Sequence, residues 1–268
     1  MPLGLVPIAL LLGSGALVGI TLGLIGGGGS VLAVPLLIYL VGVPSTHVAI
    51  GSSAAAVAVN AGWGLVTHAR LGTVKWRCAL VFTAAGVAGA FLGAHLGKQL
   101  GGPELLALFG LAMIGIGIYM VSAHPQAVGQ DVRLTPESAG YLLPRLLLFG
   151  GGAGILSGFF GIGGGFLIVP GLVLATGMGL QNAIGTSLFA VTAFGLTTAT
   201  SYAVSGLIDW RIVLLVVAGG AVGTLLGVRT NTQLAGHKRA LAGVFAGVVI
   251  ATGLYIVGSG LLKVLGAS

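Results

Sequence analysis

Charged residues and cysteines are scarce in this sequence, and both shortages limit what the protein does. Only 6% of the 268 residues are charged and 56% are hydrophobic, whereas soluble domains average about 25% charged residues. The single cysteine, Cys78, excludes an internal disulfide and supplies no cysteine pair to a metal site. No acidic residue precedes Glu104, and we expect neither a metal ion nor a cofactor. The composition indicates an integral membrane protein.

Hydrophobic runs fill most of the chain, and only residues 123–140 are polar and long enough for an extramembrane linker. The first Lys or Arg is Arg70, so the N-terminus lacks the positive region of a cleaved signal and is expected to remain as the first helix. We therefore expect an all-α polytopic membrane protein. Its ten segments are 4–25, 28–43, 47–68, 77–97, 104–122, 141–160, 163–178, 182–204, 211–229 and 239–258.

The second half of the chain repeats the first. The stretch "GLIGGGGSVLAVP" at 23–35 returns as "GFFGIGGGFLIVP" at 158–170, and "AIGSS" at 49–53 returns as "AIGTS" at 183–187. "GTVKWR" at 72–77 likewise returns as "GLIDWR". These matches predict two homologous halves of five segments each. We expect a first transmembrane repeat at 1–122, a polar linker at 123–140 and a second repeat at 141–268.

The positive charges predict how the halves are oriented. Lys and Arg are scattered in short loops between apolar runs, a pattern that indicates membrane topology and no nucleic-acid partner. If all ten segments cross, one side holds Arg70, Lys75, Arg77, Arg133, Arg145, Arg229, Lys238 and Arg239, and the other holds Lys98, Arg211 and Lys263. An odd number of crossings per half makes the repeats inverted and places both termini outside. If 28–43 and 163–178 fail to cross, the bias is weaker, and this alternative stays open.

The second segment of each half is short and contains a proline, Pro35 in the first and Pro170 in the second. Short segments interrupted by Gly and Pro at matching places in two halves are typical of discontinuous helices in inverted-repeat transporters. We expect helix breaks at 25–30 and 160–165. There, free backbone N–H groups and a helix N-terminus favour an anion.

Uncharged hydroxyl and amide groups follow both expected breaks, and they suit a small oxyanion better than a metal cation. As a hypothesis, His47 exchanges protons or donates to the anion. The alternatives are that the glycines serve helix packing, that the hydroxyls bond to carbonyls one turn back, and that His47 is an interfacial residue. The candidate substrate-binding residues are Gly27, Gly28, Gly29, Ser30, His47, Ser52, Ser53, Gly163, Gly164, Gly165, Gln181, Thr186 and Ser187.

The duplicated set "GxGGG" before an apolar run ending in Pro, then "AxGSS" or "AxGTS", then "GxxxWR", resembles the TauE/SafE family of sulfite-exporter-like permeases. The resemblance covers nearly the whole chain. It implies a bacterial or archaeal inner-membrane permease, a secondary transporter for sulfite, organosulfonates or other small anions. Ser30 stands where the second copy has Gly165, and this difference bears on the choice of substrate.

Two other functions were weighed. A passive small-anion channel would use the same polar lining but would need a continuous path. An intramembrane serine hydrolase would use Ser157 of "GILSGFFG", yet the only histidine of the second copy is His237, outside the middle of a segment. We expect a transporter, no enzyme, with a small anion and the lipid bilayer as partners. A homo-oligomer remains open.

Overall fold

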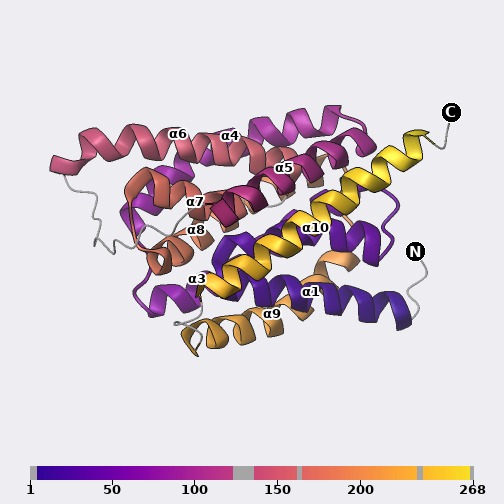
Figure 1. Cartoon of the computed structure of the whole chain (residues 1–268), viewed down its shortest axis with the longest axis horizontal. Coiled ribbons are helices and arrows are strands. Elements are labelled where there is room, and N and C mark those ends of the chain that lie inside the picture. Colours follow the sequence, from indigo (N-terminus) through magenta and orange to yellow (C-terminus); the bar gives the residue numbers. More distant parts are fainter. Residues whose placement is uncertain (1–4, 123–135, 162–164, 234–237, 266–268) are drawn as a thin grey trace.

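The computed structural model describes residues 5–122, 136–161, 165–233 and 238–265, and these residues are almost entirely helical (Figure 1). The elements of the first half are α1 (Leu5–Ile25), a 3-10 helix η1 (Gly26–Leu32), α2 (Ala33–Pro35), a π-helical turn η2 (Leu36–Leu40), α3 (Thr46–Arg70), α4 (Trp76–Gln99) and α5 (Gly102–Ser122). Those of the second half are α6 (Pro136–Phe160), α7 (Gly165–Thr176), α8 (Leu180–Val204), α9 (Trp210–Gln233) and α10 (Lys238–Leu265).

The helix ends follow the local sequence. Ser45 precedes α3, and its hydroxyl accepts a hydrogen bond from the N–H of Val48 at 3.4 Å. Pro136 and Glu137 occupy the first turn of α6, which suits a helix N-terminus, so α6 begins within the stretch expected to be linker. Gly72 and Gly206, at φ +68° in both cases, follow α3 and α8 and end them in the same way.

Seven helices of the described residues are long and apolar enough to cross a membrane, and α1, α3, α4 and α8 are among them. The second segment of each half is different. In the first half it is divided among η1, α2 and η2, and in the second half α7 spans only 12 residues. The all-helical, polytopic architecture expected from the sequence is confirmed, with the second segments as its irregular elements.

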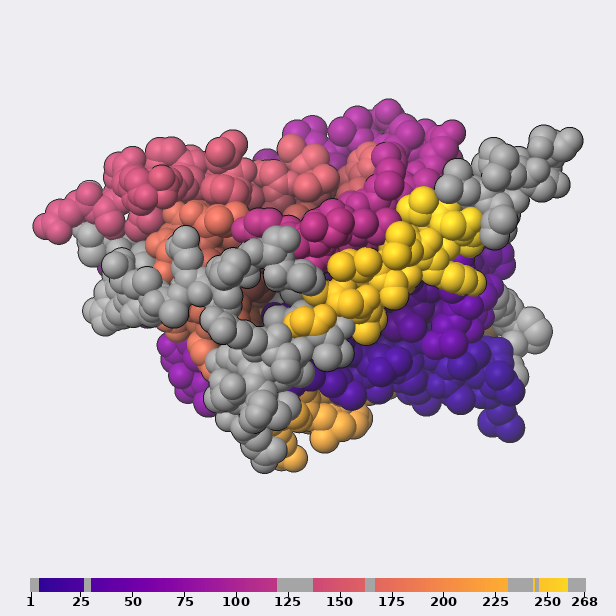
Figure 2. Space-filling model, in the orientation of Figure 1, coloured from indigo at the N-terminus to yellow at the C-terminus, as the bar shows by residue number. Residues whose placement is uncertain are grey.

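Helices of one half pack mainly on helices of the other. The fourth helix of each half lies along the first helix of the other, in the pairs α4 with α6 and α1 with α9. The third helices, α3 and α8, pack together, and so do α5 and α10. Figure 2 shows α10 crossing one face of the molecule diagonally beside α5.

Glycines allow the closest of these contacts. A Cβ atom on Gly19 of α1 would collide with the carbonyl oxygen of Gly220 on α9, and one on Gly154 of α6 would collide with that of Gly86 on α4. Small residues let helix backbones approach in this way. Gly154 lies 135 residues after Gly19 and Gly220 lies 134 after Gly86, so the two contacts are equivalent. Gly150, Gly154 and Gly158, spaced four residues apart on α6, all approach the backbone of α4 in this way.

These reciprocal contacts show that the two similar halves pack against each other through equivalent helices. When residue i of one half touches j of the other, the equivalent of j touches the equivalent of i, which is the pattern of a two-fold relation. In Figure 1, α1 begins at the right-hand end of the molecule and α6 begins at the left-hand end. The third helices lie where the halves meet.

Candidate functional site

The candidate site lies between α3 and α8, where each helix carries two neighbouring hydroxyl residues in its second turn. Ser52 and Ser53 of α3 and Thr186 and Ser187 of α8 are all 0% exposed. Neither helix contains an acidic residue. The structure therefore places four hydroxyl groups, unaccompanied by carboxylates on their own helices, in the interior of the molecule.

The first hydroxyl of each pair holds a loop of the opposite half. Ser52 Oγ accepts a hydrogen bond from the N–H of Asp209 at 3.0 Å, and Thr186 Oγ1 accepts one from the N–H of Lys75, also at 3.0 Å. The two bonds are equivalent, because both residues of the second-half set lie 134 positions after their counterparts. In the part of the chain that the structure describes, neither hydroxyl proton has an acceptor. Both remain available as donors.

The second hydroxyl of each pair bonds to its own helix, as one of the alternatives expected. Ser53 Oγ donates to the carbonyl oxygen of Ile50 at 2.9 Å, and Ser187 Oγ donates to that of Ile184 at 2.8 Å. Such bonds bring the hydroxyl oxygen against the backbone one turn back. Ser53 Oγ also lies 3.4 Å from the carbonyl oxygen of Gly161, the residue that follows α6.

The glycine after the first helix of each half packs against the hydroxyl pair of the other half. Gly26 and Gly161 have left-handed backbones, at φ +72° and +66°, which glycine adopts without strain. A Cβ atom on Gly26 would lie 3.1 Å from Ser187 Oγ, and one on Gly161 would collide with Ile50. Each turn that ends a first helix therefore meets the third helix of the other half.

The remaining glycine and serine candidates belong to the second segment of each half. Gly27, Gly28 and Gly29 continue into η1, and Ser30 in the same element is fully buried. Gly165 is the first residue of α7, whereas Gly163 and Gly164 lie outside the described residues. The expected break at 25–30 coincides with the end of α1 and the start of η1.

His47 and Gln181 occupy equivalent positions in the two halves but different environments. His47 is half-buried, its ring stacks on that of Tyr202 with centroids 6.5 Å apart, and its Nε2 atom is buried with no hydrogen-bond partner among the described residues. Gln181 is exposed at the start of α8. The structure therefore brings His47, but not Gln181, into contact with the interior of the opposite half.

The sequence did not indicate the parts played by the two loops. Lys75 and Asp209 belong to the duplicated "WR" motifs. Their backbone N–H groups bond to the central hydroxyls of the other half. The sequence did contain one indication, since each loop and its hydroxyl residue recur with the same offset of 134 residues. This offset did not show that the loop of one half bonds to the hydroxyl of the other.

The fold defines a polytopic membrane protein. The chain belongs to the Sulfite exporter TauE/SafE family, whose model matches residues 11–256. It is 46% identical over 246 residues to a probable membrane transporter protein of Xylella fastidiosa, covering 92% of this chain and 93% of that one. It is 26% identical over 213 residues to probable membrane transporter protein YdhB of Bacillus subtilis, covering 80% and 86%. No solved structure matches the chain significantly.

Proposed function

We propose that this protein is a secondary transporter that moves a small sulfur oxyanion, such as sulfite or an organosulfonate, outward across the cell membrane. The observation that carries this proposal is the reciprocal meeting of hydroxyl pairs and glycine turns between α3 and α8. Ser52 and Thr186 offer one unused O–H donor from each half. The family's description as a sulfite exporter supports the choice of substrate.

Such a site binds an anion by replacing its hydration shell with hydrogen-bond donors held in fixed positions. An oxyanion that leaves water loses strong hydrogen bonds, and buried O–H and N–H groups aimed at it replace them without a covalent step. Because α3 and α8 carry no acidic residue, the anion meets no like charge from either helix. Neutral donors also bind less tightly than a lysine or arginine would, which suits a substrate that must be released.

The complete burial of the four hydroxyls supports a carrier over the alternative of a passive channel. At 0% exposure they contact no solvent, so an anion reaches them only after the packed helices move apart. Inverted halves that alternately open around a central site supply such a motion. The opposite starting ends of α1 and α6 in Figure 1 support this arrangement, in which both termini are external.

His47 is the proposed proton-exchanging group of this carrier. Its Nε2 atom is buried without a partner among the described residues, and either nitrogen of an imidazole ring is able to carry a proton. The second half supplies an uncharged replacement, since Gln181 occupies the equivalent position. We expect His47→Gln to preserve sulfite binding but to remove the dependence of flux on a proton gradient.

The proposed function is tested by measuring sulfite flux in proteoliposomes that contain the purified full-length protein. Chloride, sulfate and a sulfonate serve as competitors, with and without an imposed proton gradient. A carrier predicts flux that saturates with sulfite concentration and that sulfonate inhibits more than chloride does. Flux that rises linearly with concentration and ignores the gradient would support the channel, and no flux of any of these anions would reject the proposal.

A further inference from the structure

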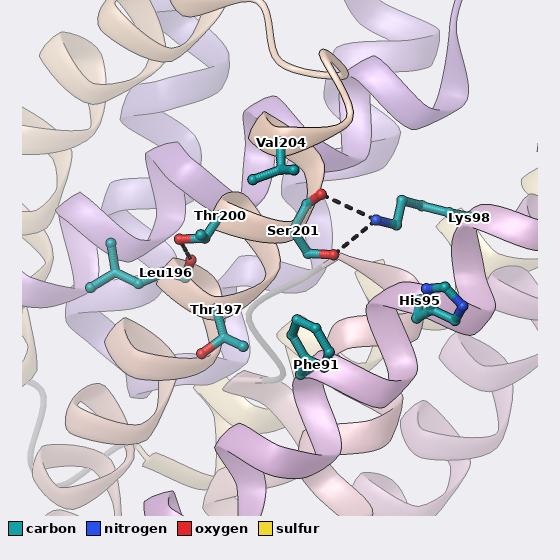
Figure 3. A pocket seen from close by; sticks show the side chains of 8 residues that line it. All are labelled: Phe91, His95, Lys98, Leu196, Thr197, Thr200, Ser201 and Val204. Carbon is teal, nitrogen blue, oxygen red and sulfur yellow. Dashed lines mark hydrogen bonds between the residues drawn. The ribbon is translucent and has the colours of Figure 1, made fainter.

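A surface groove separates the C-terminal parts of α4 and α8, away from the central hydroxyls (Figure 3). Its volume is about 480 Å³, within the range of roughly 300–1,000 Å³ typical of small-molecule sites. Lys98 and His95 contribute from α4, and Ser201 contributes from α8. The proposed transport function uses none of these three residues.

Lys98 provides a fixed positive charge at one end of the groove. Its Nζ atom donates to the carbonyl oxygen of Ser201 at 3.1 Å, to Ser201 Oγ at 3.0 Å and to Ser205 Oγ at 3.1 Å. It also lies 5.8 Å from the centre of the Tyr202 ring. All of these partners are neutral, and no carboxylate pairs with Lys98 within the described residues. The ammonium group is thus positioned but its charge is uncompensated.

Two further hydrogen-bonding groups lie beside this positive end. Ser201 Oγ accepts from Lys98, so its own proton points elsewhere and is available to an anion. His95 precedes Lys98 by three residues, which places both on one face of α4, and it is exposed. By contrast, the hydroxyl of Thr200 donates to the carbonyl oxygen of Leu196 at 2.8 Å and is already used.

The rest of the groove is apolar and exposed. Phe91, Leu196 and Val204 are 59%, 52% and 85% exposed, and Figure 3 shows Phe91 and Leu196 away from the Lys98 ammonium group, with Val204 beside Ser201. A small hydrated anion would gain nothing from such walls. A ligand with an anionic head and a hydrocarbon tail matches both parts, because the head pairs with Lys98 and the tail covers the apolar side chains.

We propose that this groove is a binding site for one anionic phospholipid, whose phosphate lies against Lys98, Ser201 and His95 and whose acyl chain lies along Phe91 and Leu196. The other half does not repeat the site. Thr232 stands 134 positions after Lys98, and Arg70 stands 134 positions before Val204. The proposal therefore concerns this groove alone, although the fold is duplicated.

The test is native mass spectrometry of the full-length protein, released from detergent with phosphatidylglycerol or phosphatidylcholine added. We expect one phosphatidylglycerol to bind at least fivefold more tightly than phosphatidylcholine. Lys98→Gln should remove that preference. The matched control is Arg145→Gln, because Arg145 is an exposed cation on α6 whose recorded partner is Tyr141 of its own helix.

Val204→Asp is a second variant that tests the proposal even if Lys98→Gln fails to fold. Val204 is 85% exposed, so an aspartate there leaves the bonds of Lys98 intact and places a negative charge at the rim of the groove. It should also weaken phosphatidylglycerol binding at least fivefold. Equal binding of both lipids, or a preference that survives both variants, would overturn the proposal. Displacement of the lipid by free glycerol phosphate at similar concentration would instead assign the groove to a soluble anion.

Discussion

At the scale of single residues, the four buried hydroxyls of α3 and α8 form two kinds of hydrogen bond. Ser52 and Thr186 hold backbone N–H groups of the opposite half, whereas Ser53 and Ser187 bond to their own helices. Removal of a hydroxyl therefore has different consequences at adjacent positions. Loss of the Ser52 or Thr186 hydroxyl removes a bond between the halves, whereas loss of the Ser53 or Ser187 hydroxyl removes a bond within its own helix.

Ser52→Ala should destabilise the protein, because it leaves the N–H of Asp209 without its acceptor. A partly buried donor that loses its partner costs about 1–3 kcal/mol. The measurement is unfolding by denaturant or heat in detergent, with Ser52→Thr as the control that retains the oxygen. Equal stability of the alanine and threonine variants would show that the bond between the halves contributes nothing.

Gly161→Ala should be more harmful than Gly206→Ala, although both glycines have positive φ, at +66° and +68°. A Cβ atom on Gly206 meets open space, so this variant carries only the left-handed strain of about 1–2 kcal/mol. A Cβ atom on Gly161 also collides with Ile50. Comparison of the two melting temperatures checks the prediction, and equal losses would contradict the close contact between α3 and the turn after α6.

Sequence reasoning located these residues but not their partners. The duplicated "AIGSS" and "AIGTS" motifs indicated equivalent hydroxyls, and back-bonding was expected as one alternative, as Ser53 and Ser187 show. The bonds to Asp209 and Lys75 were not foreseen. An internal repeat specifies which positions are equivalent, but it does not specify which half each position contacts.

At the scale of helices, the glycine-rich faces join the two halves. Gly154 of α6 and Gly19 of α1 occupy equivalent contacts, with α4 and α9 respectively. Glycines at a four-residue spacing are typical of helix packing, and Gly150, Gly154 and Gly158 serve it here. The sequence could not reveal that the first helix of each half packs on the fourth helix of the other, since both helices present the same small-residue pattern.

Gly154→Val should disrupt the contact between α6 and α4, because its side chain would enter the space of the Gly86 carbonyl. Overpacking of this kind costs about 1–3 kcal/mol or more. The control is Gly152→Ala on the same helix, where a Cβ atom meets open space. Thermal unfolding in detergent compares the two, and a Gly154→Val variant as stable as the control would contradict the close approach of these helices.

At the scale of the whole molecule, the orientation of the halves in the membrane remains a prediction. It rests on the eight Lys and Arg residues counted on one side and the three on the other, and on the opposite starting ends of α1 and α6 in Figure 1. The reciprocal contacts alone fix how the halves fit together, but they do not fix which end faces the cytoplasm.

Cysteine labelling tests this orientation directly. In a Cys78→Ala background, Leu71→Cys and Val204→Cys introduce one thiol each at exposed positions near the ends of α3 and α8, where Leu71 is 54% and Val204 is 85% exposed. Inverted halves predict that a membrane-impermeant maleimide added outside intact cells labels Val204→Cys but not Leu71→Cys. Labelling of both from the same side would contradict the inverted arrangement.

The central claim is that one hydroxyl pair from each half binds the transported anion. The most direct measurement is the concentration of sulfite that gives half-maximal flux in proteoliposomes containing the wild type, Ser52→Ala, Thr186→Val or the double variant. The control, Ser157→Ala, removes a buried hydroxyl of α6 that has no hydrogen-bond partner among the described residues. The account predicts that each single variant raises this concentration about two- to twelvefold, as expected for the loss of one hydrogen bond of about 0.5–1.5 kcal/mol, and that the double variant raises it further. Unchanged flux in the double variant, or an equal effect of Ser157→Ala, would contradict it.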